Sequence, residues 1–189
     1  MDDSKFGLFA LCEQPFFIGD CMDNELYLCE VEPDYLKFLH KIDSRVSVKY
    51  NNRPYIGIIT MINNIKYVVP LTSQTTDKRK AEGKSKRAAR ITTFVKDSEE
   101  IEIANILHNN MIPIDDKNFH LVDINAEIDT YEANEIRFIR KNKERIIKKA
   151  KKVHDDRILK RDYFLRKTCC DFEKLEQEYM NYSKKESCQ

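Results

Sequence analysis

RPYIGIITMINNIKYVVPLTS, residues 53–73, is the stretch that decides the fold of this chain. Two runs rich in Ile, Val and Tyr, Tyr55 to Ile62 and Ile65 to Leu71, flank Asn63-Asn64. Paired asparagines tolerate the left-handed backbone of a tight turn, so the pattern predicts a β-hairpin. Proline cannot donate a hydrogen bond to a neighbouring strand, and Pro70 is therefore expected to end the second strand or to mark an edge.

Two hydroxyl side chains, Thr72 and Ser73, follow the hairpin where a strand gives way to a loop. By themselves, such residues more often cap a strand than form a site. Residues 78–90 come next and are dense in lysine and arginine. Hydroxyl groups beside concentrated positive charge suggest a phosphate ligand.

The remaining pattern predicts an α+β fold, a twisted antiparallel, partly barrel-like sheet flanked by helices. Residues 78–90 contain Gly83 and no apolar period, which indicates a loop or a short irregular helix. Strands are predicted at residues 26–31, 101–106, 111–114 and 121–124, and helices at residues 33–41, at 130 to about 154, and after Asp171.

Charge is balanced overall but unevenly distributed. The chain has 189 residues, which suits one domain, with 33 Lys and Arg against 32 Asp and Glu. Acidic residues gather before residue 44, and basic residues gather in 78–90 and 137–167. Such clustering of basic residues is typical of nucleic-acid binding, although a run of charges is more often a solvated helix face. The acidic clusters near residues 97–100 and 155–156 are interpreted as solvated turns or helix ends.

The cysteines form no CxxC pair and have no matching histidine spacing, which argues against a zinc site and favours reduced thiols in a cytosol. The apolar run at residues 6–12 is short and follows two aspartates, so we interpret it as neither a signal peptide nor a membrane anchor.

A resemblance to a known family rests on several motifs in order. They are Tyr-Ile-Gly-Ile at 55–58 with Val-Pro-Leu-Thr-Ser at 69–73, Tyr35-Leu-Lys-Phe-Leu39 with Asp43, the strands at 111–114 and 121–124, and the segments 131–140 and 170–179. Together they resemble the ToxN/AbiQ family, the endoribonuclease toxins of type III toxin–antitoxin systems. The resemblance covers about Glu25 to Lys184. We therefore expect residues 1–22 to be an N-terminal extension of unknown role and residues 23–189 to be a single ToxN/AbiQ-like domain.

The resemblance implies a toxic, metal-independent endoribonuclease of the bacterial cytoplasm that needs no cofactor. Such an enzyme cleaves single-stranded, adenine-rich RNA, including cellular or phage mRNA, to a 2′,3′-cyclic phosphate and a 5′-hydroxyl. Its partner is a small repeated, pseudoknotted antitoxin RNA, which it processes and which inhibits it in a closed protein–RNA hetero-oligomer. The biological role would be phage defence or plasmid maintenance.

The resemblance also implies site residues. Arg53, Thr72 and Ser73 are the expected catalytic residues, with Arg53 in place of the family's usual lysine. Thr75 stands where the family has a second lysine, which leaves the proton donor open, with Lys78 and Lys80 the nearest cations. None of the four histidines falls on a catalytic motif of the family. The expected RNA-binding residues are Tyr35, Tyr50, Tyr55, Lys78, Lys80, Lys84, Lys86, Arg87 and Arg90, supported by a positive face over residues 137–152.

Alternatives remain open for the tyrosines and for the function. An aromatic ring beside a cation suits an unstacked RNA base, but Tyr35 and Tyr55 could equally pack in the core. The chain could also be a non-catalytic RNA-binding module, or an RNase toxin with a protein antitoxin. Tandem short repeats in the DNA upstream would favour an RNA antitoxin, and a small acidic reading frame would favour a protein one.

Overall fold

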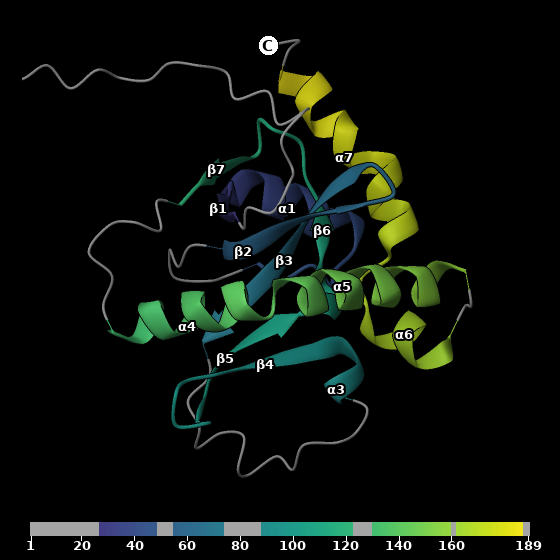
Figure 1. Ribbon diagram of the computed structural model, residues 1–189. Helices are drawn as coiled ribbons and strands as arrows, with labels where there is room; N and C mark the ends of the chain where they lie inside the picture. Colours follow the sequence, from purple (N-terminus) through teal and green to yellow (C-terminus); the bar gives the residue numbers. More distant parts are fainter. Residues whose placement is uncertain (1–26, 49–54, 74–87, 123–129, 160–161, 187–189) are drawn as a thin grey trace, which may run out of the picture.

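The computed structural model describes residues 27–48, 55–73, 88–122, 130–159 and 162–186 (Figure 1). One antiparallel sheet with the strand order β4-β5-β3-β2-β1-β7 forms its centre, and β6 pairs with β3. The sheet is curled but is not closed into a barrel, so the predicted α+β class is confirmed. The strands are β1 (Leu28–Val31), β2 (Tyr55–Ile62), β3 (Ile65–Ser73), β4 (Thr92–Lys96), β5 (Glu102–Leu107), β6 (Ile112–Pro113) and β7 (Phe119–Leu121).

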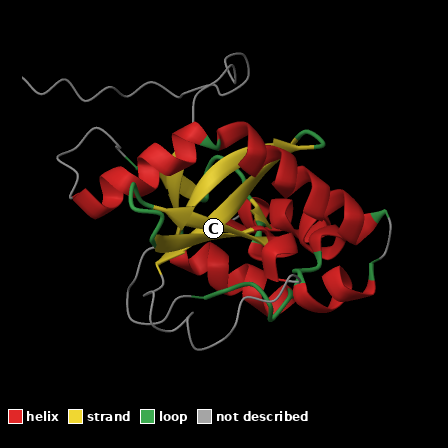
Figure 2. Cartoon of the chain, turned by 60° about the horizontal axis from the view of Figure 1, so that its bottom comes forward, coloured by secondary structure: helices red, strands yellow, loops and turns green. Residues whose placement is uncertain are grey.

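Helices surround the sheet (Figure 2). Two of them, α4 and α5, follow one another across the sheet, and α4 contacts β4 and β5, while α7 packs on α1 and β6. No helix in the described ranges is long and apolar enough to cross a membrane. The helices are α1 (Pro33–Ile42), α3 (Ala88–Ile91), α4 (Thr130–Lys141), α5 (Lys143–Ile158), α6 (Tyr163–Thr168) and α7 (Phe172–Glu186), with a 3₁₀ turn at His108–Asn110.

The predicted hairpin is confirmed in β2 and β3. Asn63 and Asn64 form its turn with φ values of 50° and 65°, the left-handed conformation that asparagine tolerates. Gly57 lies within β2, where a Cβ atom would come 2.7 Å from the carbonyl oxygen of Val69 and 2.3 Å from a methyl group of Val68. Glycine is therefore required for the close approach of the two strands.

Pro70 does not end the second strand, so the first of the two predicted possibilities is wrong. It pairs with Gly57 inside β3, and the strand continues to Ser73. On its other side β3 pairs with β6 through Tyr67 and Val68, and with β5 from Leu71 onward. Pro70 lies between these two partners, at a position where its missing N–H interrupts neither ladder.

A buried polar cluster fixes β3 against the helices. Tyr67 donates its hydroxyl hydrogen bond to Glu176 Oε1 at 2.5 Å, and His154 Nε2 lies 2.8 Å from the same oxygen. Burial opposes ionisation of Glu176, but the hydrogen bonds from His154 and Tyr67 outweigh it and lower the pKa of this carboxyl group. The cluster connects the centre of the sheet with α5 and α7.

The long helix predicted from residue 130 to about 154 is two helices, α4 and α5, which meet at Asn142. The Asn142 amide side chain donates to the carbonyl oxygen of Phe138 at 2.8 Å, and its backbone N–H is shared between Phe138 and Ile139. A side chain that competes for backbone acceptors in this way interrupts a helix. Strand β4 and helix α6 were not predicted, and β7 begins before the predicted 121–124 segment.

Candidate nucleic-acid interface

The predicted hydroxyl site lies at the end of β3, where the strand has left β2 and pairs with β5. Thr72 lies opposite Asn105 of β5, and Asn105 lies opposite Phe94 of β4. Directly paired residues of antiparallel strands project to the same face of a sheet, with Cβ atoms about 5 Å apart. These three side chains therefore form a row across three strands, which we call the Thr72 row.

The neighbouring row of the same strands faces the other way. Ile106 pairs with Leu71 on one side and with Thr93 on the other, all three are buried, and Thr93 faces the helices α4 and α5. Because successive side chains of a strand alternate between faces, the Thr72 row lies on the face turned away from α4. Thr72 and Phe94 are half-buried there.

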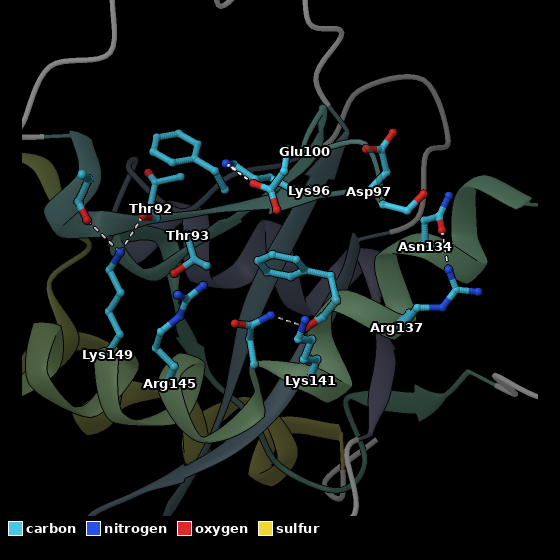
Figure 3. Close-up of a pocket in the computed structure, with 15 residues that line it drawn as sticks. Thr92, Thr93, Lys96, Asp97, Glu100, Asn134, Arg137, Lys141, Arg145 and Lys149 are labelled. Carbon is cyan, nitrogen blue, oxygen red and sulfur yellow. Dashed lines mark hydrogen bonds and ion pairs between the residues drawn. The ribbon is translucent and has the colours of Figure 1, made fainter.

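A cleft of about 730 Å³ is lined by residues of β4 and of the helices α4 and α5 (Figure 3). Five basic residues line it, against the two carboxylates Asp97 and Glu100. Figure 3 shows Lys149 and Arg145 of α5 extending toward β4, whereas Arg137 of α4 extends toward Asn134, to which it donates a hydrogen bond. Phe94 of the edge strand is also a lining residue, whereas Thr72 and Asn105 are not. We call this site the cationic cleft and define it by Lys96, Arg137, Lys141, Arg145 and Lys149.

Two of these cations have fixed positions. Lys149 Nζ donates to the carbonyl oxygens of Ala89 at 2.7 Å and Thr92 at 2.6 Å, and burial followed by the charge of Arg145 lowers its pKa. Lys96 Nζ lies 2.6 Å from Glu100 Oε2, and this hydrogen bond lowers the pKa of the Glu100 carboxyl group. Arg137, Lys141 and Arg145 are exposed along the helices, where they can meet an anion.

The cationic cleft shows which residues of the predicted positive face at 137–152 lie together. Arg137, Lys141, Arg145 and Lys149 recur at intervals of four residues, a spacing that places side chains on one side of a helix. This four-residue periodicity is the signal in the sequence that could identify these four residues. The contribution of β4 was missed because residues 92–96 were not recognised as a strand.

Tyr35 and Tyr55 are core residues, which corrects their expected role in base stacking. Tyr35 is 0% exposed and donates to the carbonyl oxygen of Pro113 at 2.8 Å. Tyr55 is 1% exposed and donates to the carbonyl oxygen of Asn110 at 3.1 Å. Neither ring presents a face to a base, and the packing alternative holds for both.

Apart from the positive face at residues 137–152, Arg90 is the one predicted RNA-binding cation within the described residues. Its guanidinium lies 2.7 Å from Asp162 Oδ2 and 5.3 Å from the centre of the Phe164 ring. These contacts fix α3 to the start of α6. Ser73 is described only as a backbone position opposite Ala104. The other predicted site residues lie outside the described ranges: Tyr50, Arg53, Lys78, Lys80, Lys84, Lys86 and Arg87.

Histidine and cysteine side chains of the described ranges are mostly enclosed. His108 is fully buried, and burial lowers its pKa to about 3. Burial raises the thiol pKa of Cys29 to about 12 and of Cys169 to about 11, which keeps both thiols protonated. Within the described part of the chain, no three His, Cys, Asp or Glu side chains gather where they could hold a metal ion.

The family model that describes the toxin ToxN of type III toxin–antitoxin systems matches residues 27–180. The chain belongs to the ToxN family. This match spans every described strand and almost all of the described helical residues, including the Thr72 row and the cationic cleft. The family resemblance seen in the sequence is thereby confirmed.

Individual members of the ToxN family agree with this assignment. The endoribonuclease ToxN of Bacillus thuringiensis subsp. kurstaki is 28% identical over 82% of this chain and 84% of its own length. The endoribonuclease AbiQ of Lactococcus lactis subsp. lactis is 26% identical over 92% of this chain and 98% of its own length. This chain is thus a member of a family of endoribonuclease toxins.

Solved structures of ToxN-family toxins share the fold. AbiQ, described as a lactococcal anti-phage endoribonuclease, matches with a TM-score of 0.73, 26% identity, and coverage of 84% of this chain and 98% of AbiQ. A second type III toxin, described as selectively inhibited by a non-coding RNA pseudoknot, matches with a TM-score of 0.70, 28% identity, and coverage of 84% of this chain and 98% of that toxin.

Proposed function

We propose that this ToxN-family toxin cleaves single-stranded RNA by metal-independent transesterification at the end of β3. In this reaction the ribose 2′-hydroxyl attacks the adjacent phosphate and expels the 5′ oxygen of the next nucleotide. The products are a 2′,3′-cyclic phosphate and a 5′-hydroxyl. The observation that carries the proposal is Thr72, a half-buried hydroxyl near the end of β3 in a chain that belongs to an endoribonuclease family.

The proposed roles follow from the chemistry of the side chains. Thr72 and Ser73 would hydrogen-bond the ribose hydroxyl or the non-bridging phosphate oxygens and hold the reacting atoms in line. Arg53 would stabilise the charge that develops on the phosphorane, because a guanidinium contacts two oxygens and keeps its charge. For the same reason Arg53 is a poor proton donor. Lys78 and Lys80 are the candidates for that role, since Thr75 replaces the expected lysine.

The cationic cleft would hold the RNA backbone near the reacting phosphate. Strands of a sheet lie about 4.8 Å apart, so Phe94 at the cleft is about 10 Å from Thr72 across β5. Successive phosphates of an extended single strand can bridge this distance. Basic side chains that track a backbone while another element holds the reacting group are typical of single-strand binding sites.

We propose a small repeated RNA as the antitoxin, because a toxin of the same fold is inhibited by a non-coding RNA pseudoknot. This toxin would process the repeats and remain inhibited in a closed complex with the product. The description of AbiQ as an anti-phage enzyme supports phage defence as the role. Phage or cellular mRNA in the cytoplasm would be the substrate of the released toxin, with adenine-rich sites preferred.

Neutralising the cleft is expected to flatten the salt dependence of RNA binding. In the double variant Arg137→Gln/Arg145→Gln, the slope of log binding constant against log salt should fall by about 1.4, at about 0.7 per lost single-strand phosphate contact. Binding is measured with 2′-O-methyl RNA, which lacks the attacking hydroxyl. The control Lys37→Gln/Lys117→Gln removes equal charge from exposed positions outside the cleft. Equal slopes for the two double variants would show that the cleft is only a solvated surface.

A further inference from the structure

Helix α6 presents an aromatic residue and two cations on its outer face. Tyr163 is 81% exposed, and Arg166 and Lys167 follow it by three and four residues, a spacing that places all three side chains on one side of a helix. Arg166 and Lys167 are exposed as well. Within the described part of the chain, none of these side chains takes part in a hydrogen bond, an ion pair or a ring contact. We call Tyr163, Arg166 and Lys167 the α6 face.

The contacts on the inner side of α6 hold this face in a fixed position. Asp162 accepts a hydrogen bond from the backbone N–H of Leu165 at Oδ1 and binds the guanidinium of Arg90 at Oδ2. Leu165 is buried in the core, and Arg45 donates to the carbonyl oxygen of Arg166 at 2.8 Å. A ligand of the α6 face would therefore meet side chains on a rigid support, which lowers the entropic cost of binding.

The α6 face carries an excess of positive charge. Asp162 is the only acidic residue between Leu159 and Cys170, and its carboxylate is already occupied by Arg90 and by the helix cap. A lone exposed aromatic residue is ordinary on a protein surface, but here it lies beside two cations that have no counter-ion. Single-stranded RNA matches both features, because its phosphates bind cations and its unpaired bases stack on aromatic rings.

The α6 face adjoins the cationic cleft through α3. Ala89 of α3 lines the cleft and accepts a hydrogen bond from Lys149, a lysine of the cleft. The next residue, Arg90, binds Asp162 at the start of α6. Figure 1 shows α3 and α6 together at one end of the molecule. RNA that leaves the cleft at this end would reach the α6 face next.

We propose that the α6 face extends the RNA interface beyond the cationic cleft, with an unpaired base stacked on Tyr163 and the flanking phosphates bound by Arg166 and Lys167. This inference rests on the proposed function, because it takes RNA as the ligand of the adjoining cleft. It also gives a role to the C-terminal part of the basic run at residues 137–167, which the cleft leaves unexplained. The α6 face adds affinity for RNA without contacting the reacting phosphate at the end of β3.

Variants of Tyr163 test the stacking contact. The probe is a single-stranded 2′-O-methyl RNA of about 16 nucleotides, the upper limit of a common single-strand binding site. Tyr163→Leu keeps an apolar side chain but removes the flat ring, and it is expected to weaken binding about tenfold, typical of one lost stacking contact. Tyr163→Phe keeps the ring and should bind as the parent does. The control Leu159→Ala changes another exposed apolar side chain, outside the α6 face, and should also bind as the parent does.

An abasic RNA of the same length separates stacking from other causes. It keeps the phosphates but offers no base, so the parent and Tyr163→Leu are expected to bind it equally well. Arg166→Gln/Lys167→Gln should weaken binding of both RNAs and lower the slope of log binding constant against log salt by about 1.4, at about 0.7 per lost phosphate contact. Equal affinity of the parent and Tyr163→Leu for the RNA with bases would overturn the proposal. A tenfold loss that persists on the abasic RNA, or that Tyr163→Phe shares, would overturn it as well.

The remaining outcomes identify other failures. A second copy of this chain is the competing occupant of an exposed apolar surface. A dimer of the RNA-free protein that Tyr163→Leu dissociates in sedimentation would overturn the proposal in favour of that contact. A parent chain that binds neither RNA would contradict the proposed function itself. A parent that binds both RNAs, beside variants without the predicted differences, would overturn only the role of the α6 face.

Discussion

Replacing Ser73 by alanine is expected to slow RNA cleavage about 100-fold, on the order of 3 kcal/mol of transition-state stabilisation, with little change in melting temperature. The substitution removes one hydroxyl group from the last residue of β3. The backbone pairing of this residue with Ala104 does not need the side chain and should persist. Arg53→Ala should have a similar effect, because it removes the cation proposed to stabilise the phosphorane.

The measurement pairs the cleavage rate with the melting temperature of each variant. Ser44→Ala, at an exposed turn after α1, is the control and should cleave as the parent does. Expressed without antitoxin, the Ser73 and Arg53 variants should permit growth where the parent arrests it. Both should still bind antitoxin RNA through the cationic cleft. A well-folded Ser73→Ala variant with full activity would remove Ser73 from the mechanism.

Mild acid is expected to destabilise the fold through His108. This side chain is 0% exposed, its Nε2 lies 2.9 Å from Thr93 Oγ1, and burial, followed by the charge of Lys149, lowers its pKa from 6.5 to about 3. Below about pH 6.5 the His108 imidazole binds a proton in the unfolded chain but stays neutral in the folded chain. The free energy of unfolding should therefore fall as the pH falls from 6.5 toward 3, by up to about 1.4 kcal/mol per pH unit.

Chemical denaturation between pH 6.5 and 4.5 checks this effect. Carboxyl groups with lowered pKa values, such as Asp43 and Glu176, lose most of their contribution below this range, as the pH falls below their unfolded pKa values of 3.8 and 4.5. His108→Gln retains a polar group for Thr93 without a titrating proton, and its stability should vary less with pH. The control His120→Gln changes an exposed histidine at β7. A His108→Gln variant with the parent's pH dependence would contradict the assignment.

The hairpin could be predicted from the sequence because its signals are local. The Asn63-Asn64 turn and the β-branched runs on both sides require no distant partner to be recognised. Whether Pro70 ends the strand or marks an edge could not be predicted, for the opposite reason. Its position is allowed by the change of partners along one edge of β3, from β6 to β5, and sequence periodicity does not show which segments lie beside a strand.

The candidate site was predicted in part for similar reasons. Thr72 and Ser73 could be selected because they end a recognisable strand within a family motif, and their role stays a prediction. The position of Asn105 beside Thr72 could not be predicted, because it depends on the pairing of β3 with β5, two segments more than thirty residues apart. Tyr35 and Tyr55 show the limit of composition, since an aromatic residue near a cation suits both a core and a base-stacking site until its burial is known.

Cleavage of single-stranded RNA in the presence of EDTA tests the central claim most directly. The account predicts that the purified chain cuts at an undiminished rate and leaves fragments that end in a 2′,3′-cyclic phosphate and begin with a 5′-hydroxyl. This result follows if the attacking 2′-hydroxyl is held by Thr72 and Ser73 and the charge is stabilised by side-chain cations. Activity that disappears in EDTA and returns with magnesium would contradict the account.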